Sequence, residues 1–165
     1  QDLRQLALRG SQGFSCLWNF AGRTFYHNNL VYRPAGDFFM FYMNDQGDPQ
    51  KYRQVYADNN VYAIDPIPSS YLRSAVKGLK VKTFEDWKKD TAQDTGSLVV
   101  KPATVPFVSY DSGDFRLTHN PWPNATQLHD RKIEGVRLSV LKDFDGKARD
   151  TAHPTAGAFE APLAQ

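Results

Sequence analysis

Four aspartates between residues 30 and 60 have the side chains that could do acid–base chemistry, namely Asp37, Asp45, Asp48 and Asp58. Cleavage of a glycosidic bond uses two carboxyl groups about 5 to 10 Å apart, and neighbouring strands of a sheet lie about 4.8 Å apart. Carboxylates at equivalent positions of neighbouring strands would therefore suit this reaction. However, Asp37 and Asp48 adjoin turn residues, and Asp58 precedes an asparagine pair whose corner we expect it to stabilise. The catalytic residues, if there are any, stay unassigned.

A second set of side chains suits the binding of a sugar rather than its cleavage. An exposed aromatic ring stacks on the apolar face of a sugar, and Arg or Lys binds acidic groups on it. The residues predicted to bind substrate in this way are Trp18, Arg23, Tyr42, Asn44, Asp45, Lys51 and Arg53. The alternative, which the sequence leaves open, is that the rings fill the interior of the protein.

No pattern in the sequence is typical of a metal site or of a cofactor site. His27, His119, His129 and His153 are scattered without ligand spacing. Asp143 and Asp145 have the spacing of a calcium loop but lack the other ligands, so a plain turn is predicted. Phosphate-binding glycine loops and nucleophile elbows do not occur. We therefore predict no metal and no cofactor.

Composition indicates one packed domain that does not bind nucleic acid. The chain has 165 residues, of which 41% are hydrophobic and 13% aromatic, and its net charge is +2. These values are typical of a globular protein with an aromatic-rich core. The sequence has no long basic run and no apolar stretch long enough to cross a bilayer. Cys16 is the single cysteine, so an internal disulfide is excluded.

The elements that would position these side chains come from a repeat between Phe14 and Ile64. Three short β-type runs, with an Asn-Asn pair before the third, are followed about thirty residues later by the same series. The pairs are Asn28-Asn29 and Asn59-Asn60. The runs are too close together for helical crossovers, so we expect parallel strands that stack directly on one another. Asparagine tolerates the left-handed corners, and stacked amides can hydrogen-bond as a ladder. The alternative is an antiparallel sandwich with the Asn pairs in turns.

A short helix is predicted after the repeat, at about residues 83–90. Thr83 can cap its N-terminus, and acidic residues in its first turn and lysines in its last suit the helix dipole. Phe84 and Trp87 are three residues apart and would face the body of the protein together. Before the helix, residues 77–82 alternate lysine with apolar residues, which predicts an exposed edge strand.

The order of motifs resembles the C-terminal portion of right-handed parallel β-helix proteins, the pectate-lyase-like superfamily of carbohydrate-active type. The motifs are the two Asn-Asn repeats, Thr83–Lys88, Asp114–Leu117, Asp145–Arg149 and Gly157–Glu160. The chain departs from the pattern at residues 120–124, where Asn-Pro-Trp-Pro-Asn replaces the usual Ser-Pro-Ala turn. The resemblance implies an all-β fold of right-handed parallel coils, with terminal coils in residues 1–65. Residues 66–165 would be an irregular closing segment that contains the helix and packs with the coils as one domain.

The resemblance also implies a function and partners. The chain would be part of a secreted or extracellular protein, or of a periplasmic one, that binds a polysaccharide or oligosaccharide and closes the coil. A whole enzyme of this type would be a glycoside hydrolase or a polysaccharide lyase, with catalytic residues mostly outside this chain. Another polypeptide, or a second copy, would cover the N-terminal coil face unless residues 1–10 do so. The alternatives are a non-catalytic carbohydrate-binding or assembly module and an unrelated β-sandwich binding domain.

Overall fold

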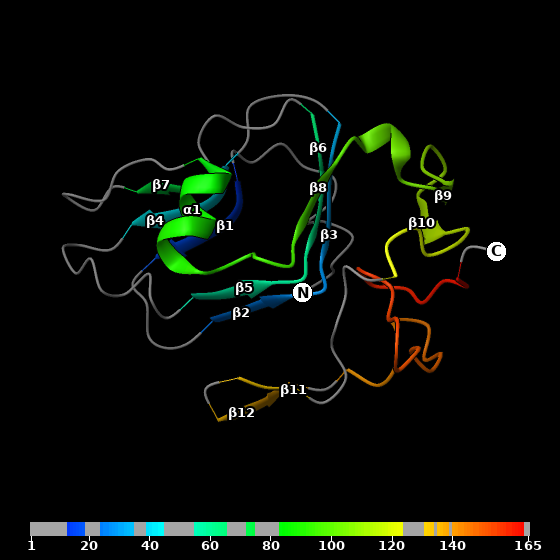
Figure 1. Cartoon of the computed structure of the whole chain (residues 1–165). Coiled ribbons are helices and arrows are strands. Elements are labelled where there is room, and N and C mark those ends of the chain that lie inside the picture. The colour runs from blue at the N-terminus through cyan, green and yellow to red at the C-terminus, as the bar shows by residue number, and fades with distance from the viewer. Residues whose placement is uncertain are drawn as a thin grey trace.

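The computed structural model describes the protein as short strands, one α-helix and irregular segments (Figure 1). The described residues are 13–18, 24–34, 39–44, 55–65, 72–74, 83–123, 131–133, 135–138 and 140–163. Over these ranges the protein is mostly β, with small parallel and antiparallel sheets. No helix in these ranges is both long enough and apolar enough to span a membrane.

The first part of the chain forms parallel sheets. Its strands are β1 (Gly13–Trp18), β2 (Thr24–His27), β3 (Leu30–Arg33), β4 (Phe39–Asn44), β5 (Val55–Asp58), β6 (Val61–Ile64), β7 (Leu72–Ser74) and β8 (Leu98–Val100). They pair in the orders β1-β4-β7, β2-β5 and β3-β6-β8, and every one of these pairs is parallel. The antiparallel alternative for this segment is therefore wrong for the described strands.

Equivalent runs of the two repeats lie side by side. Thr24 pairs with Val55 in one sheet, and Leu30 pairs with Val61 in another. Both pairs have the spacing of Asn29 and Asn60, which are 31 residues apart. The parallel pairing of equivalent runs that the repeat predicted is thus confirmed.

The asparagine pairs form the corners between strands, as predicted. Asn28 has a φ of 55° and Asn59 a φ of 56°, both in the left-handed region. The backbone N–H of Asn28 donates to the carbonyl oxygen of Asn59 at 3.1 Å, so one corner lies directly against the other. Asparagine serves here because most other side chains are strained at positive φ.

Replacing Asn28 by valine is expected to lower the free energy of unfolding by about 1 to 2 kcal/mol, because a β-branched residue is strained at positive φ. The Asn28 side-chain oxygen has no hydrogen-bond partner among the described residues, so loss of the amide should add little. Asn28→Gly is the matched control and should cost less. Urea denaturation followed by circular dichroism measures both. If both variants lost the same free energy of unfolding, the positive φ would not be the reason that asparagine occupies this position.

Strand β6 is the centre of the described core. All four of its residues are buried, and Tyr62 is only 1% exposed. A central strand covered on both faces is apolar along its whole length, which explains the run Val-Tyr-Ala-Ile. Ala63 packs with Val105, Leu117 and Ala161 from the closing part of the chain. The core therefore joins the repeat to the segments that follow it.

Helix α1 (Phe84–Thr91) confirms the predicted helix to within one residue. Thr83 Oγ1 accepts from the backbone N–H of Asp86 at 3.1 Å and thereby caps the N-terminus. Trp87 is fully buried, and the Phe84 ring meets Tyr62 edge to face at 6.0 Å between centroids. The expectation that Phe84 and Trp87 face the body together is confirmed. The edge strand predicted at 77–82 lies outside the described residues.

The closing part of the chain contains antiparallel pairs that the sequence did not predict. Its elements are a turn of 3-10 helix (Pro102–Thr104), β9 (Phe107–Ser109), β10 (Asp114–Leu117), β11 (Arg131–Ile133) and β12 (Val136–Leu138). Strand β9 pairs with β10, and β11 pairs with β12. Residues 140–163 are irregular, apart from single bridges such as the one between Asn120 and Leu163.

Candidate functional site

Sheet β1-β4-β7 carries three of the seven residues predicted to bind a sugar. Trp18 is the register partner of Asn44, and Tyr42 stands between Cys16 and Arg73. Because side chains alternate along a strand, positions 18, 42, 44 and 73 share one face of this sheet. The structure describes only the backbone at these positions. The register of the strands alone places Trp18, Tyr42 and Asn44 on one face of the sheet.

The other four predicted residues, Arg23, Asp45, Lys51 and Arg53, lie outside the described residues. Asp37 and Asp48 also lie outside them. Their part in a binding site stays a prediction.

Asp58 takes the structural role expected of it. Its Oδ1 atom accepts from the backbone N–H of Asn59 at 2.9 Å and from that of Gly96 at 2.7 Å. A Cβ atom at position 96 would lie 2.7 Å from the Asn59 side-chain nitrogen, so only glycine fits this approach. Asp58 holds the corner together, and one of its oxygens is already used by two backbone donors.

Two of the rings on the repeat lie inside or between the strands. Tyr62 is buried, and its hydroxyl donates to Asp94 at 2.8 Å. Tyr56 stacks on its register partner Phe25, with centroids 5.1 Å apart. Trp122 packs against the buried clusters of β6 and the closing segment. Of these rings Tyr62 lies in the interior, whereas Tyr56 and Trp122 are half-buried against their neighbours.

A chain of amide hydrogen bonds runs through the corners. The Asn29 side-chain nitrogen donates to Asn60 Oδ1 at 2.9 Å, and the Asn60 side-chain nitrogen donates in turn to Asp94 Oδ1 at 3.2 Å. Asn60 Oδ1 also accepts from the backbone N–H of Asn29 at 3.0 Å. The Asn60 side-chain nitrogen also donates to the carbonyl oxygen of Tyr26 at 2.9 Å. The predicted asparagine ladder is therefore present, and it continues from Asn29 through Asn60 to Asp94.

Asp94 ends this ladder, and sequence reasoning missed it. Its side chain is fully buried and also accepts from Ser97 Oγ at 2.6 Å and from Trp87 Nε1 at 3.1 Å. An ionised carboxylate has no hydrogen to donate, so no donor is left pointing onward from it. The available signal was the spacing of Asp94, which follows Asn60 by 34 residues. Its positive φ of 52° repeats that of the asparagine corners.

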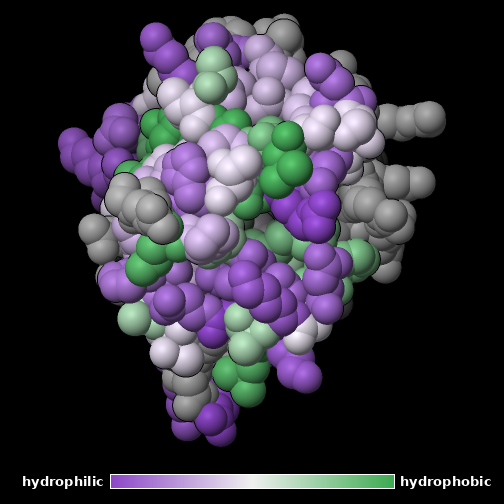
Figure 2. Space-filling model, turned by 90° about the vertical axis from the view of Figure 1, so that its right-hand side faces the viewer, coloured by the Kyte–Doolittle hydropathy of each residue, from purple (hydrophilic) through white to green (hydrophobic). Residues whose placement is uncertain are grey.

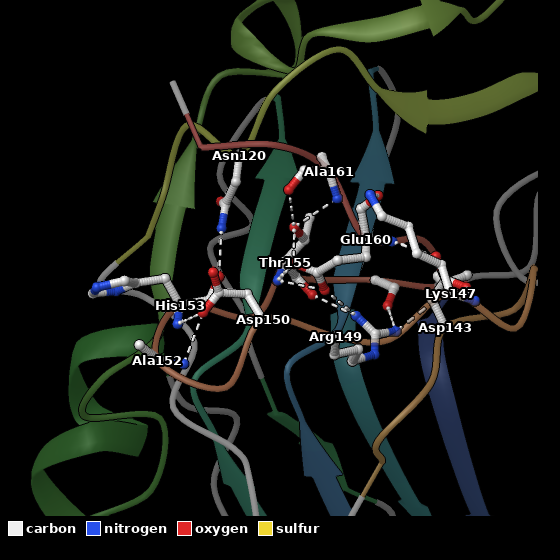
Figure 3. Close-up of polar contacts among 12 residues, drawn as sticks. Asn120, Asp143, Lys147, Arg149, Asp150, Ala152, His153, Thr155, Glu160 and Ala161 are labelled. Carbon is white, nitrogen blue, oxygen red and sulfur yellow. Dashed lines mark hydrogen bonds and ion pairs between the residues drawn. The ribbon is translucent and has the colours of Figure 1, made fainter. Parts of the chain in front are cut away.

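A second polar cluster closes the C-terminal segment (Figure 3). Arg149 donates to the carbonyl oxygens of Thr155 at 3.0 Å and Gly157 at 2.8 Å, and to Glu160 Oε2 at 3.3 Å. The side chains of Arg149 and Glu160 are 10% and 4% exposed. Thr155 Oγ1 donates to Glu160 Oε1 at 3.1 Å. The Arg149 fork thus ties together a loop that has no sheet to hold it.

Asp143 joins this cluster to a turn. Its two carboxylate oxygens accept the backbone N–H groups of Lys147 and Glu160, each at 2.8 Å. The N–H of Gly146 donates to the Asp143 carbonyl oxygen at 3.1 Å. Residues 143–147 therefore form the plain turn that was predicted instead of a calcium loop. Nowhere in the described ranges do three His, Cys, Asp or Glu residues come close enough to hold a metal ion.

The pKa of the Asp143 carboxyl lies below its ordinary value of 3.8. Burial is the largest single influence and raises this pKa. Backbone hydrogen bonds from Glu160, Lys147 and Asp145, together with the charge of Arg149, lower the pKa by more than burial raises it. A carboxyl with a depressed folded pKa stabilises the protein above its unfolded pKa, and this stabilisation is lost as the pH falls through the folded value.

We therefore expect acid to destabilise the protein partly through Asp143, as the pH falls below about 4. In Asp143→Asn the free energy of unfolding should vary less with pH in this range, although it is lower at neutral pH. The exposed turn residue Asp145, replaced by asparagine, is the control. Thermal melts between neutral pH and strong acid measure the effect. A pH dependence that is the same in all three proteins would contradict it.

Large apolar side chains that stay exposed are spread over several elements. The exposed ones are Leu98, Val108, Val140, Leu141, Phe144 and Leu163. Figure 2 looks onto the side of the molecule where β9 and β10 lie in Figure 1, and its coloured part shows separate apolar groups among polar ones. The described part of this face is therefore mixed, which suits a polar ligand better than a broad apolar partner.

The side chains of the two polar clusters described here hydrogen-bond mainly to one another and to the backbone. No protein-family model, no curated protein and no solved structure matches this chain.

Proposed function

We propose that this chain forms terminal coils of a right-handed parallel β-helix in an extracellular or periplasmic carbohydrate-active protein. In this proposal it contributes a polysaccharide-binding face and closes the C-terminal end of the coil. The observation that carries the proposal is the order in which the chain visits its parallel sheets. Strands β1, β2 and β3 lie in three different sheets, and β4, β5 and β6 visit the same sheets again in the same order.

The third passage of the chain supports the closing role. Strands β7 and β8 add to two of the sheets, while α1 and the loop after it stand where a third strand beside β5 would come. Gln93 Oε1 accepts from the N–H of Ala57 at 2.6 Å, and the N–H of Asp94 donates to the carbonyl oxygen of Ala57 at 2.7 Å. These contacts use backbone groups that another coil would otherwise pair. With the buried Trp87, they cover the edge of β5 at this end of the stack.

The opposite end supports a partner. Among the described strands, β1, β2 and β3 each form the outer edge of their sheet. The outer edge of a sheet can add another strand. At the corner before β3, the N–H of Gly157 already donates to the carbonyl oxygen of Asn28 at 2.8 Å. In the proposal, another polypeptide or a second copy of the chain covers these three edges. Light scattering with size-exclusion chromatography tests this point, since a stable monomer that does not aggregate would contradict it.

The binding face is assigned to sheet β1-β4-β7, where Trp18, Tyr42 and Asn44 share one side by register. An aromatic ring beside amide groups suits a sugar, which offers both an apolar face and hydroxyls. The test is affinity electrophoresis of the chain against a panel of plant and microbial polysaccharides. Trp18→Ala should lose retardation on the polysaccharide that retards the native chain, whereas Leu141→Ala, on an exposed loop, should keep it. Retention by no polysaccharide would contradict the binding role.

Catalysis by a whole enzyme of this kind, a glycoside hydrolase or a polysaccharide lyase, is assigned to residues outside this chain. The support is that Asp58 and Asp94 are used by structural hydrogen bonds. The isolated chain should release no reducing ends and no unsaturated products from the panel. Turnover that disappears on substitution of an aspartate of this chain would overturn that assignment.

A further inference from the structure

Four aromatic rings gather where strand β3 meets the β9–β10 hairpin. Tyr32 lies 5.0 Å from Phe107 and 4.9 Å from Tyr110, measured between ring centroids. Phe115 lies 5.8 Å from Phe107 and 5.7 Å from Tyr110. We call Tyr32, Phe107, Tyr110 and Phe115 the ring cluster. All four rings are half-buried, so each keeps part of its surface in water.

The cluster has an inner and an outer part. Tyr32 and Phe107 pack against the buried group of Ala63, Val105, Leu117 and Ala161. Tyr110 and Phe115 rest on these two rings and on each other, beyond that buried group. Because the inner pair packs on the core, the outer pair lies on a fixed support. Rings held in this way lose little conformational freedom when a ligand stacks on them.

Polar groups stand at the edge of the rings. Burial raises the pKa of the Tyr32 hydroxyl, and the Tyr110 hydroxyl and the Asp111 carboxylate raise it to a smaller extent. Tyr110 begins a tight turn, since the N–H of Gly113 donates to its carbonyl oxygen at 3.0 Å. Asp111 in that turn is exposed. An exposed carboxylate thus follows directly on the half-buried ring of Tyr110.

The charges at this place disfavour an acidic ligand. The cation next to Phe115 is Arg116, whose Nε donates to Asp114 Oδ1 at 2.8 Å in a two-point ion pair. That bond also holds the pKa of Asp114 below its ordinary value. Asp111, in the turn beside Tyr110, forms no ion pair with another described residue. Hydrogen-bond acceptors and hydroxyl groups therefore predominate beside the rings. Such groups suit the hydroxyl groups of a neutral sugar.

We propose that the ring cluster is a second carbohydrate subsite, which stacks a neutral oligosaccharide on Tyr110 and Phe115 and holds its hydroxyls with Tyr110 and Asp111. The inference rests on the proposed function, and it adds a place and a substrate class to it. The subsite belongs to the closing segment and is distinct from the β1-β4-β7 face. A sugar chain bound at both places would be held by two sets of contacts, which strengthens binding beyond either alone.

The test is saturation-transfer difference NMR on the full chain with neutral hexasaccharides of β-1,4-glucan, β-1,4-mannan, β-1,4-xylan and α-1,4-glucan, and with hexagalacturonate as the acidic probe. At least one neutral hexasaccharide should bind, and Tyr110→Ala should weaken it about tenfold. Tyr110→Phe and Asp111→Asn keep the packing and should weaken it less. Val108→Ala, in the same strand as Phe107 and half-exposed, is the matched control and should bind as the native chain does.

The outcomes separate the two proposals. Neutral binding that is unchanged in Tyr110→Ala and Asp111→Asn but lost in Trp18→Ala overturns the second subsite and leaves the proposed function standing. A preference for hexagalacturonate that depends on Tyr110 overturns the neutral class. Absence of binding to every hexasaccharide overturns the subsite, and absence of polysaccharide retention as well overturns the proposed function.

Discussion

Replacing Asp94 by alanine is expected to lower the free energy of unfolding by about 4 kcal/mol, the largest effect among the substitutions considered. Asp94 is fully buried and accepts hydrogen bonds from Tyr62, Ser97, Asn60 and Trp87. Each buried donor that loses its acceptor costs about 1 to 3 kcal/mol. Alanine is also strained at the positive φ of this position.

The conservative substitution Asp94→Asn separates these causes. Asparagine tolerates the backbone conformation and keeps an oxygen for the three donors that meet Oδ1. Its nitrogen, however, would face the Trp87 N–H, so two donors would oppose each other. We expect a loss of about 2 kcal/mol.

Urea denaturation with an unchanged m-value measures both Asp94 variants. The control is Asp145→Asn, in an exposed turn, which should stay within about 0.5 kcal/mol of the native chain. If Asp94→Asn were as stable as this control, Asp94 would not be the end point of the ladder that we describe.

Arg149→Ala is expected to have the second-largest effect, about 3 kcal/mol. The substitution would leave the nearly buried carboxylate of Glu160 without its cation. It would also remove the donors to the carbonyl oxygens of Thr155, Gly157 and Ala158. A buried charge that loses its partner costs more than the pair contributes, because its desolvation is no longer offset.

Arg149→Lys should restore only part of this loss, because an ammonium group cannot place several donors in one plane as the guanidinium fork does. Thermal melts measure the stability of both variants. Limited proteolysis within residues 140–160 should speed up in Arg149→Ala, since this segment has little other backbone pairing. Lys132→Ala, an exposed residue on β11, is the control. Cleavage of Arg149→Ala at the native rate would show that the cluster does not hold the segment.

Four features were predictable because they depend on local preference and on spacing. The repeat predicted which strands pair. When every run is separated from its equivalent by the same number of residues, the equivalent runs come to lie side by side. The Asn-Asn pairs predicted the corners between strands, because asparagine tolerates the left-handed backbone conformation. The helix at Phe84–Thr91 was predictable from its cap and its charges. Asp58 was predictable from its place before a corner.

Other features could not be predicted because no period or local propensity marks them. The β9–β10 and β11–β12 pairs join runs of only three or four residues, too short for a recognisable alternation of apolar and polar residues. Asp94 follows a helix instead of a strand, so its likeness to Asn60 is hidden in the sequence. The seven predicted sugar-binding residues stay a prediction, since their side chains lie outside what the structure describes.

The sequence by itself determined the local geometry: where the chain turns left-handed, where it forms a helix, and which runs are equivalent. Only the tertiary structure decided that Asn29, Asn60 and Asp94 form one directed hydrogen-bonded series. It alone decided that Tyr32 shares a cluster with Phe107, Tyr110 and Phe115. The physical reason is that directed hydrogen bonds and ring packing depend on the relative placement of segments tens of residues apart. Residue type tells only what each side chain can donate, accept or bury; the fold decides what it meets.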